Sequence, residues 1–436
     1  MFLQNAISKR MHDKNPVKVA LIGAGKFGSM FLSQVPSTNG LEVSVIADLK
    51  PENAIKACKN VGWNDDLIKK TKFVDQGVEA IKLDEVDVVI ESTGFPSAGI
   101  EHARQAFQNG KHIVMVNVEA DVLAGAALVK EAKSAGVVYS MAYGDQPALT
   151  AEIVEWARAS GFNVTSAGKG TRYQPIYHKS SPDTVWDYYG LTHEEARKAG
   201  MNPKMFNSFL DGTKSGLEMA AIANACDLEV PTNGLLFPPC GMDDLANILK
   251  PLEFGGLLEK NGQVEVVSSL ERDGRPVFKD LRWGVYAVLE APNDYAASCF
   301  KQYGMNTDDT GKYSAMYKPF HLIGMELNIS VFSAALLNQA TGQTKKFTGD
   351  VVSTTKKNLK KSEILDGEGG ATVWGKLVPS KLSLSMEALP IGLAHGIKLK
   401  NEIEENKIIT WNDVDFSSND PAISYRRKME KDFKKS

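Results

Sequence analysis

Residues 17–35, VKVALIGAGKFGSMFLSQV, decide the fold of this chain, because an apolar strand passes directly into a glycine-rich turn and then a helix. The turn has the pattern G-x-G-x-x-G and comprises Gly23, Ala24, Gly25, Lys26, Phe27 and Gly28. Its first glycine permits the tight turn, the second lets the backbone approach a pyrophosphate, and the third lets the helix pack on the strand. The start of the helix offers unpaired N–H groups to phosphates. This stretch therefore predicts a dinucleotide site that these six residues form.

An acidic residue stands where such a site needs one. A second β-branched strand, residues 42–47, ends in Asp48, whose distance along the chain from Gly28 is the one that the dinucleotide-binding fold requires. A carboxylate here accepts hydrogen bonds from the adenosine ribose hydroxyls and repels a 2′-phosphate, so Asp48 favours NAD(H) over NADP(H). NADP(H) stays open as the alternative, because the nearby Lys50 could pair with that phosphate.

The alternation of strands and helices continues beyond Asp48. Further apolar strands are predicted at residues 86–94, 112–116 and 137–141, with helices at 97–109 and 124–135 between them. Strands that are apolar throughout are typical of a parallel sheet covered on both faces. The fold class is therefore α/β, with a doubly wound parallel Rossmann sheet whose ligands lie beyond the carboxyl ends of the strands.

Polar residues follow three of the predicted strands, at 92–94, 117–121 and 143–147. They would be solvated loops if the sheet bound nothing, but together they lie at the edge where the nicotinamide end of a cofactor should sit. We therefore add Thr93, Gly94, Asn117 and Glu119 to the predicted cofactor contacts.

Charged residues after position 160 suggest a second, α+β substrate domain with chemistry of its own. Lys169 lies between two glycines after a predicted strand at 162–167, and Asp211, Lys214 and Glu218 gather at the start of an apolar helix. We predict that Lys169 and Lys214 polarise a substrate oxygen and that Asp211 or Glu218 relays the proton. The alternatives are a surface turn around Lys169 and a surface ion pair between Lys214 and Glu218, which are separated by one helical turn.

The remaining third of the chain gives weaker signals. A helix is predicted from about 319 to 340, packing back on the Rossmann domain, with His321 near its start. The run 345–361 holds six lysines and is expected to be a solvated linker, with anion binding as the alternative. The following sequence is rich in predicted strands, and residues 425–436 are expected to fray.

Composition excludes several classes of protein. The chain has 436 residues, a hydrophobic fraction of 43%, a net charge of −3 and no long uninterrupted apolar run, so we expect neither membrane nor nucleic-acid binding. Its four cysteines are far apart, which indicates a reducing compartment. With no apolar signal segment at the start, we expect a cytoplasmic protein. The charge is uneven, with 17 Lys/Arg against 13 Asp/Glu after residue 344.

The segment 1–340 resembles the homoserine dehydrogenase-like oxidoreductases, and longer stretches resemble more closely the deoxyxylulose phosphate reductoisomerase-like (DXR-like) branch. These stretches are NVEADV (117–122), SAGKG (166–170), DGTKSGLEMAAIANA (211–225), PFHLIGMEL (319–327), DGEGGATVWGKLVPS (366–380) and ALPIGLAHGIKLK (388–400). Residues 394–416 also resemble a SAF-type β-clip. The resemblance implies a Rossmann domain at 1–160, a substrate and dimerisation domain at 161–344, a basic linker with a SAF-like module at 345–436, and a homodimer.

The resemblance also implies an activity. Some DXR-like proteins convert deoxyxylulose phosphate to methylerythritol phosphate, an isoprenoid precursor, so we expect an oxidoreductase acting on CH–OH donors with a small polyhydroxylated substrate, with or without phosphate. If the carbon skeleton rearranges, a divalent Mg or Mn ion would be expected, with Glu119, Asp145 and Glu218 as candidate ligands. Asp48 supports a rival, an NAD-linked dehydrogenase of a sugar acid or polyol. A non-catalytic nicotinamide-nucleotide redox sensor is the alternative from another class.

Overall fold

The computed structural model describes residues 3–417 and 419–434, which form two compact units. Unit 1 comprises residues 1–152 and 321–345, and unit 2 comprises residues 153–320 and 346–436, apart from the positions not described. The expected tail segment 345–436 is therefore part of unit 2 from residue 346 onward. We describe each unit by itself.

Unit 1 is built on a six-stranded sheet in the order β3-β2-β1-β4-β5-β6, with all strands parallel. The strands are β1 (Val17–Ile22), β2 (Leu41–Ala47), β3 (Lys72–Val74), β4 (Val88–Glu91), β5 (His112–Met115) and β6 (Tyr139–Met141). This is the strand order of the dinucleotide-binding fold, so the predicted doubly wound sheet is confirmed. The edge strand β3 was not predicted, because it is too short to show a pattern of its own.

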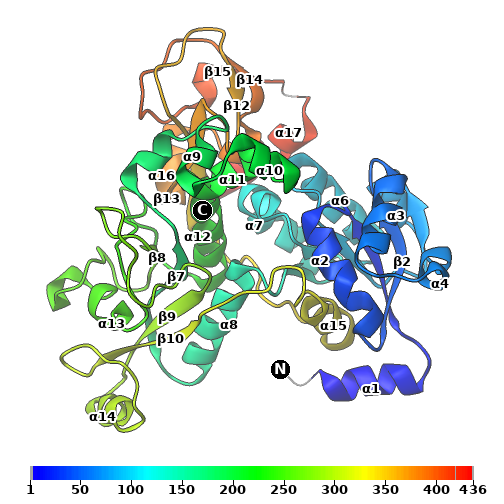
Figure 1. Cartoon of the computed structure of the whole chain (residues 1–436), viewed down its shortest axis with the longest axis horizontal. Coiled ribbons are helices and arrows are strands. Elements are labelled where there is room, and N and C mark those ends of the chain that lie inside the picture. Colours follow the sequence, from blue (N-terminus) through cyan, green and yellow to red (C-terminus); the bar gives the residue numbers. More distant parts are fainter. Residues whose placement is uncertain (1–2, 418, 435–436) are drawn as a thin grey trace. The chain divides into compact units, whose positions relative to one another are not determined.

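The helices of unit 1 cover this sheet, and Figure 1 shows α2 and α3 alongside β2 in the blue part of the chain. They are α1 (Gln4–His12), α2 (Lys26–Gln34), α3 (Pro51–Asn60), α4 (Asp65–Lys70), α5 (Gly77–Ile81), α6 (Pro96–Gln108), α7 (Val118–Ser134) and the start of α8 (Gln146–Ala159). The core joins strand residues such as Leu21 and Ile90 to helix residues such as Phe31.

A late segment completes this core. Helix α15 (Asn328–Leu337) packs against β1, β4, β5 and β6, and its Val331 and Phe332 are buried there. The predicted helix from about 319 is wrong in its first half, since irregular structure and turns separate β10 (Tyr313–Lys318) from α15. His321 consequently lies in this irregular segment and not at a helix start.

Unit 2 contains a four-stranded mixed sheet in the order β10-β9-β7-β8. Its strands are β7 (Asn163–Thr171), β8 (Gln263–Ser268), β9 (Val285–Glu290) and β10. Helix α12 (Thr213–Cys226) packs on β7 and β8 and also on β11 (Gly349–Thr355) and β13 (Val373–Pro379). Every residue of α12 except Lys214 is buried, which makes this helix the centre of the unit.

The other helices of unit 2 surround this centre. They are the end of α8, then α9 (Val185–Tyr189), α10 (His193–Lys198), α11 (Pro203–Leu210), α13 (Leu245–Ile248), α14 (Asp294–Gln302), α16 (Ser380–Met386) and α17 (Pro421–Lys434). The remaining strands, β12 (Ile364–Asp366), β14 (His395–Leu399) and β15 (Val414–Asp415), form a small antiparallel sheet.

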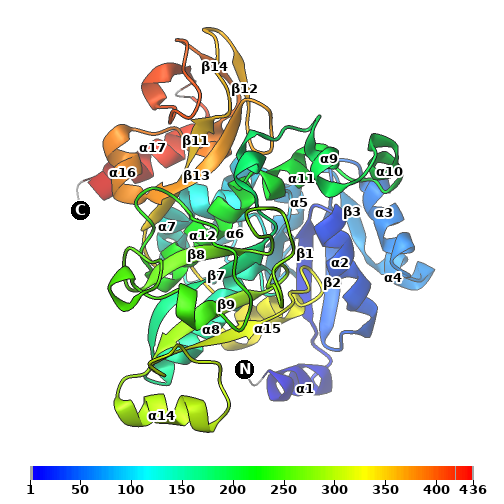
Figure 2. The same ribbon diagram turned by 60° about the vertical axis from the view of Figure 1, so that its left-hand side comes forward.

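The tail of the chain is more deeply integrated than the sequence suggested. Strand β11 begins within the basic run and is buried along its whole length, so the expected solvated linker is wrong. Residues 425–434 belong to α17, whose Arg426 is fully buried between Asp350 and Glu430, so the expected fraying of these residues is also wrong. Figure 2 shows α16 and α17 beside the orange β11–β13 pair. The SAF-type assignment of this module stays a prediction.

No helix within the described residues is both long and apolar enough to cross a membrane.

One acid in the core of unit 2 is held by hydrogen bonds to the main chain. Glu265 on β8 is fully buried, and its carboxylate accepts backbone N–H groups of Leu236, Phe237 and Val266 at 2.8–3.3 Å. Burial is the largest influence on this group and raises its pKa from 4.5 to about 7. Glu265 thus fixes the segment that carries Phe237.

The raised pKa predicts how stability varies with pH. Between about pH 4.5 and 7 the folded protein keeps the Glu265 proton and the unfolded chain releases it, so the free energy of unfolding falls as pH rises. Glu265→Gln retains the acceptor oxygen and removes the titration. Its free energy of unfolding relative to the natural chain should therefore rise across this window, by about 3 kcal/mol at most. Chemical denaturation at several pH values measures the difference. The control Glu229→Gln, in an exposed pair with Lys260, should show no such trend.

Candidate active site

The glycine turn of unit 1 has the geometry of a phosphate cradle. A Cβ on Gly28 would lie 2.5 Å from the carbonyl oxygen of Gly23, so the close packing of helix on strand requires glycine there. Gly23 has φ +94° and also lies against the main chain of Ser92. Gly25, by contrast, is exposed and has nothing within 4 Å of its Cβ position, and it caps α2. The space above Gly25, at the positive end of α2, suits a pyrophosphate.

Two backbone hydrogen bonds hold Asp48 beside this turn. Its Oδ2 accepts the N–H of Ala24 and its Oδ1 accepts the N–H of Lys50, both at 3.1 Å. Each carboxylate oxygen keeps a lone pair for a further donor, such as a ribose hydroxyl. The residues predicted from the G-x-G-x-x-G pattern thus meet in one place and fit a nicotinamide dinucleotide.

A buried acid that sequence reasoning missed supports the loop after β4. Glu91 is fully buried, and its Oε1 accepts a hydrogen bond from the Thr93 hydroxyl and lies 3.3 Å from Nδ1 of His102. Its Oε2 has no hydrogen-bond partner within the described residues. Glu91 therefore orients Thr93, while Gly94 beside it is exposed with φ +72°. The sequence signal that could have found Glu91 is an acid as the last residue of the otherwise apolar strand β4.

The start of α7 holds two further predicted contacts. Asn117 is buried and caps the helix, since its Oδ1 accepts the N–H of Ala120 at 3.0 Å and its Nδ2 donates to the carbonyl of Phe95 at 2.9 Å. It thus ties the loop after β4 to α7, and a direct contact with the cofactor stays a prediction. Glu119 is half-buried in the first turn of α7, and its predicted role is likewise untested.

Unit 2 contains a buried ion pair between two of the predicted catalytic residues. Lys169 lies inside β7, and its Nζ contacts Oε2 of Glu218 on α12; both side chains are at most 7% exposed. Both alternatives considered from the sequence, a surface turn around Lys169 and a surface ion pair between Lys214 and Glu218, are therefore wrong. Apart from the contact with Lys169, Glu218 Oε2 accepts no hydrogen bond within the described residues, so it can still accept one from a substrate hydroxyl.

The glycines beside Lys169 are required by close packing. A Cβ on Gly168 would lie 1.9 Å from the carbonyl oxygen of Glu265, and one on Gly170 would lie 1.9 Å from that of Leu281. Because Gly168 and Gly170 have no side chains, the backbone at Glu265 and at Leu281 packs directly against β7 on either side of Lys169.

Asp211 is neutralised by a lysine that the sequence did not single out. Lys356 Nζ lies 2.7 Å from Asp211 Oδ2 and donates to the carbonyl oxygens of Ser180 and Gly370, also at 2.7 Å. Asp211 Oδ1 accepts the N–H of Thr213, the first residue of α12, at 2.8 Å. Because both of its oxygens are engaged, Asp211 has a structural role in the start of α12. Lys214, on the first turn of the same helix, is half-buried.

A histidine next to this pair was also missed. His178 Nδ1 lies 2.7 Å from the carbonyl oxygen of Asp211 and therefore carries the proton, so Nε2 accepts from the Tyr173 hydroxyl at 3.0 Å. Its ring stacks on Trp374 with centroids 4.1 Å apart. Burial is the largest influence on His178 and lowers its pKa, which keeps the ring neutral at physiological pH.

The candidate metal ligands do not assemble. Among the described residues, no group of three or more His, Cys, Asp or Glu side chains is placed to hold a metal ion. In unit 1, Asp145 is buried and its Oδ1 accepts the N–H of Gln146 at 2.8 Å. The donor set proposed from the sequence is therefore not supported.

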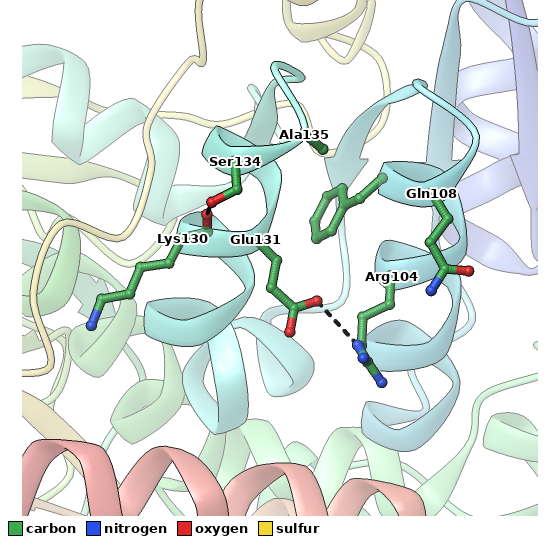
Figure 3. Close-up of a pocket in the computed structure, with 7 residues that line it drawn as sticks. Arg104, Gln108, Lys130, Glu131, Ser134 and Ala135 are labelled. Atoms are coloured by element: carbon green, nitrogen blue, oxygen red, sulfur yellow. Dashed lines mark hydrogen bonds and ion pairs between the residues drawn. The ribbon is translucent and has the colours of Figure 1, made fainter.

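A pocket in unit 1 lies away from the predicted residues. It is lined by Arg104, Phe107 and Gln108 of α6, Lys130, Glu131 and Ser134 of α7, and Ala135. Figure 3 shows the ion pair of 3.1 Å between Arg104 and Glu131 that joins the two helices. These residues lie in the C-terminal turns of α6 and α7, which end at the amino ends of the strands. The glycine cradle lies at the carboxyl ends of the strands, so the pocket is at the opposite edge of the sheet.

Two family models match consecutive parts of the chain. Residues 17–143 match a model described as the oxidoreductase family, NAD-binding Rossmann fold, and residues 144–327 match one described as oxidoreductase DRL, catalytic domain. The cradle lies in the first segment, and Lys169, Asp211, Lys214 and Glu218 lie in the second. No curated protein matches the chain.

Solved structures similar to the chain include three oxidoreductases. A myo-inositol dehydrogenase from Lactobacillus casei, solved with NAD(H) and myo-inositol, is 18% identical over 39% of this chain and 50% of that one, with a TM-score of 0.31. KijD10, a 3-ketoreductase from Actinomadura kijaniata solved with NADP, is 16% identical over 37% and 50%, with a TM-score of 0.26. A putative oxidoreductase from Bacteroides fragilis is 16% identical over 76% and 92%, with a TM-score of 0.35. The chain thus covers about half the length of the first two.

The family matches agree with the cradle in unit 1, since the part that contains it is similar to the NAD-binding Rossmann fold of an oxidoreductase family. They name neither homoserine dehydrogenases, nor the reductoisomerases, nor a SAF module, so these finer assignments stay predictions.

The cradle geometry predicts different effects for two similar substitutions. Gly25→Ala adds a methyl group in open space where phosphates are expected, so it should weaken dinucleotide binding at least tenfold and change the melting temperature little. Gly28→Ala adds one 2.5 Å from a carbonyl oxygen and should lower stability by about 2 kcal/mol. Titration calorimetry and thermal unfolding separate the two. Equal loss of stability in both variants would contradict the assignment of Gly25.

Proposed function

We propose that this protein transfers hydride between a nicotinamide cofactor and a carbonyl or hydroxyl carbon of a small polyhydroxylated substrate, with Lys169 and Glu218 acting on the substrate oxygen. The observation that carries the proposal is their buried ion pair within the segment that matches an oxidoreductase catalytic domain. Bound NAD(H) would supply or accept the hydride, and Gly23, Gly25, Gly28 and Asp48 would hold it.

The chemistry of the pair suits this reaction. A lysine ammonium donates a hydrogen bond to a carbonyl oxygen as negative charge develops on it, and it can give that oxygen a proton. The Glu218 carboxylate beside Lys169 balances its charge and can accept the proton of a substrate hydroxyl in the reverse direction. Burial also excludes water, which strengthens both interactions.

The other two predicted catalytic residues receive different roles. Asp211 has both oxygens engaged by Lys356 and by the start of α12, so we assign it a positioning role. It fixes the helix turn from which Lys214 and Glu218 project. Lys214 is half-buried on that turn and remains a second candidate for contact with the substrate oxygen.

The nature of the substrate distinguishes the remaining alternatives. A reductoisomerase acting on a phosphorylated ketose, as the DXR-like resemblance implies, would use NADPH and a divalent ion. The rival, an NAD-linked dehydrogenase of a sugar acid or polyol, needs neither. It agrees better with Asp48 and with the finding that, among the described residues, no three His, Cys, Asp or Glu side chains are placed to hold a metal ion. Assays of polyols, sugar acids and phosphorylated ketoses with both cofactors, with and without Mg²⁺ or Mn²⁺, would decide between them.

Removing the Lys169 ammonium should slow turnover strongly without weakening cofactor binding. Lys169→Met should lower kcat by about 10² to 10⁴-fold, the usual size of acid–base catalysis, and leave the dissociation constant of NAD(H) unchanged. The control Lys179→Met removes an exposed lysine of unit 2 that pairs with Glu405, and it should retain full activity. Steady-state kinetics and calorimetry give the two readouts.

A second variant distinguishes lost catalysis from lost folding. Lys169→Met leaves Glu218 buried without its cation, which costs about 3–5 kcal/mol in comparable pairs, whereas the double variant Lys169→Met/Glu218→Met replaces the pair by apolar groups at little cost. It should fold and remain inactive. A folded and active double variant would overturn the proposal. If every variant binds NAD(H) and no substrate in the panel turns over with the natural chain, the redox sensor is favoured.

Asp48 predicts the choice of cofactor. The natural chain should bind NAD(H) more tightly than NADP(H), because the carboxylate held beside the glycine turn repels a 2′-phosphate. Asp48→Asn should reduce this preference at least tenfold by weakening NAD(H) binding and relieving the repulsion. The two dissociation constants measured by calorimetry test this, and tighter binding of NADPH by the natural chain would contradict it.

A further inference from the structure

Glu91 lies at the edge of the sheet where the nicotinamide half of a cofactor is expected. Strands β2 and β4 flank β1 on either side. Asp48 follows β2, so a ribose bound there places the adenosine half of the cofactor beyond β2, and the other half extends beyond β4. Glu91 is the last residue of β4, and the hydroxyl of the next residue, Ser92, donates to the carbonyl oxygen of Gly23 at 2.8 Å. The end of β4 is thus joined to the glycine turn that would hold the phosphates.

The two carboxylate oxygens of Glu91 have different surroundings. Oε1 accepts the N–H of Thr93 at 3.3 Å and its hydroxyl at 2.5 Å, and it lies 3.3 Å from Nδ1 of His102. Oε2 is buried and has no hydrogen-bond partner within the described residues, so a proton on Oε2 would have no acceptor there. Hydrogen-bond donors around Oε1 stabilise a negative charge on the group. Both observations indicate that Glu91 is an ionised carboxylate in the interior of unit 1.

The negative charge of Glu91 has no cation to balance it within the described residues. No lysine or arginine there pairs with Glu91, and the contact with His102 requires a hydrogen on Nδ1, which one tautomer of the neutral imidazole supplies. A second hydrogen, on Nε2, would have no acceptor in the part of the chain that the structure describes. Nε2 packs instead against Gly77, whose Cβ position lies 2.4 Å away. The neutral ring therefore fits its surroundings, and Glu91 differs from Glu218 and Asp211, which each have a lysine in contact.

We propose that Glu91 determines the redox preference of the cofactor site, by making unit 1 bind NAD⁺ more tightly relative to NADH. The nicotinamide ring of NAD⁺ carries a positive charge and that of NADH carries none. A carboxylate in the interior is weakly screened, so it attracts the oxidised ring and has little effect on the reduced one. The site would thereby favour the form of the cofactor that accepts hydride, which is the direction of substrate oxidation.

This inference rests on the nicotinamide cofactor of the proposed function but on neither its substrate nor Lys169. Glu91 would act as a fixed charge near the nicotinamide, without donating or accepting a proton in the reaction. Its charge is distinct from its second role, in which Oε1 orients Thr93. The substitution Glu91→Gln separates the two, because the amide keeps a carbonyl oxygen for Thr93 and His102 and removes the charge.

Calorimetric titration of the full-length chain with NAD⁺, NADH and ADP tests the proposal without any turnover. Glu91→Gln should weaken the binding of NAD⁺ about tenfold and change the dissociation constants of NADH and ADP less than twofold. ADP contains the adenosine half alone, so it reports any general damage to the cradle. A tenfold change in the ratio of the NAD⁺ and NADH dissociation constants raises the potential of the bound two-electron couple by about 30 mV.

Two further variants serve as matched controls. Glu131→Gln removes the same charge from a solvent-accessible pair with Arg104 at the opposite edge of the sheet, and it should keep the natural ratio of NAD⁺ to NADH affinity. Thr93→Val removes the hydroxyl that donates to Glu91 and leaves the carboxylate in place. It should therefore change the affinities for NAD⁺ and NADH by the same factor.

Three results would overturn the proposal: an unchanged ratio in Glu91→Gln, an equal loss of NAD⁺, NADH and ADP binding in that variant, or the same change of ratio in Thr93→Val. The second would show a purely structural role, and the third would assign the preference to the position of the loop. Lys169→Met should keep the natural ratio. If the ratio depends on Glu91 but Lys169→Met is fully active, the role of Lys169 is rejected and this inference stands, whereas a natural chain that binds neither NAD⁺ nor NADH rejects both.

Discussion

The structure of unit 2 depends on how the charges at the start of α12 are neutralised. This helix is buried along nearly its whole length between the four-stranded sheet and the β11–β13 pair. Asp211 and Glu218 are carried into the interior with it, and an isolated carboxylate there would cost several kcal/mol in lost hydration. Lys356, which follows β11, and Lys169 from β7 supply the missing charges. Each layer that packs on α12 therefore contributes one cation.

These two ion pairs are chemically different. Lys356 is surrounded by fixed acceptors, two carbonyl oxygens and Asp211, so its three N–H groups are all engaged. Lys356 therefore joins the segments that carry these acceptors and has no N–H group left for a ligand. Within the described residues, Glu218 Oε2 accepts no hydrogen bond beyond its contact with Lys169, which lies between glycines over which backbone has closed. The first pair fixes the helix start, and the second retains capacity for a ligand. Burial alone would not distinguish them, but the count of engaged donors and acceptors does.

Much of unit 1 could be predicted from the sequence because its signals are local. The strand, the glycine turn and Asp48 follow one another closely, and each has a backbone reason that a single sequence displays. The same reasoning missed Glu91 as the residue that orients Thr93, since its partner His102 is on another element. In unit 2 the residue types were found but not their partners: Glu218 was matched with Lys214 at helical spacing, whereas its partner is on a strand much earlier in the chain. Lys356 was taken for part of a solvated run because lysine pairs usually are, and only the burial of β11 shows otherwise.

The buried cations of unit 2 show what their pairing with carboxylates does and does not indicate. Lys169, Lys356 and Arg426 are almost completely buried, and each has a carboxylate in contact. This is what desolvation demands of a folded chain, so such cations are weak evidence for ligands. Glu218 differs from the carboxylates that neutralise Lys356 and Arg426, because within the described residues its Oε2 accepts no hydrogen bond beyond the contact with Lys169. That spare acceptor, and not the buried charge itself, is the feature that indicates a ligand.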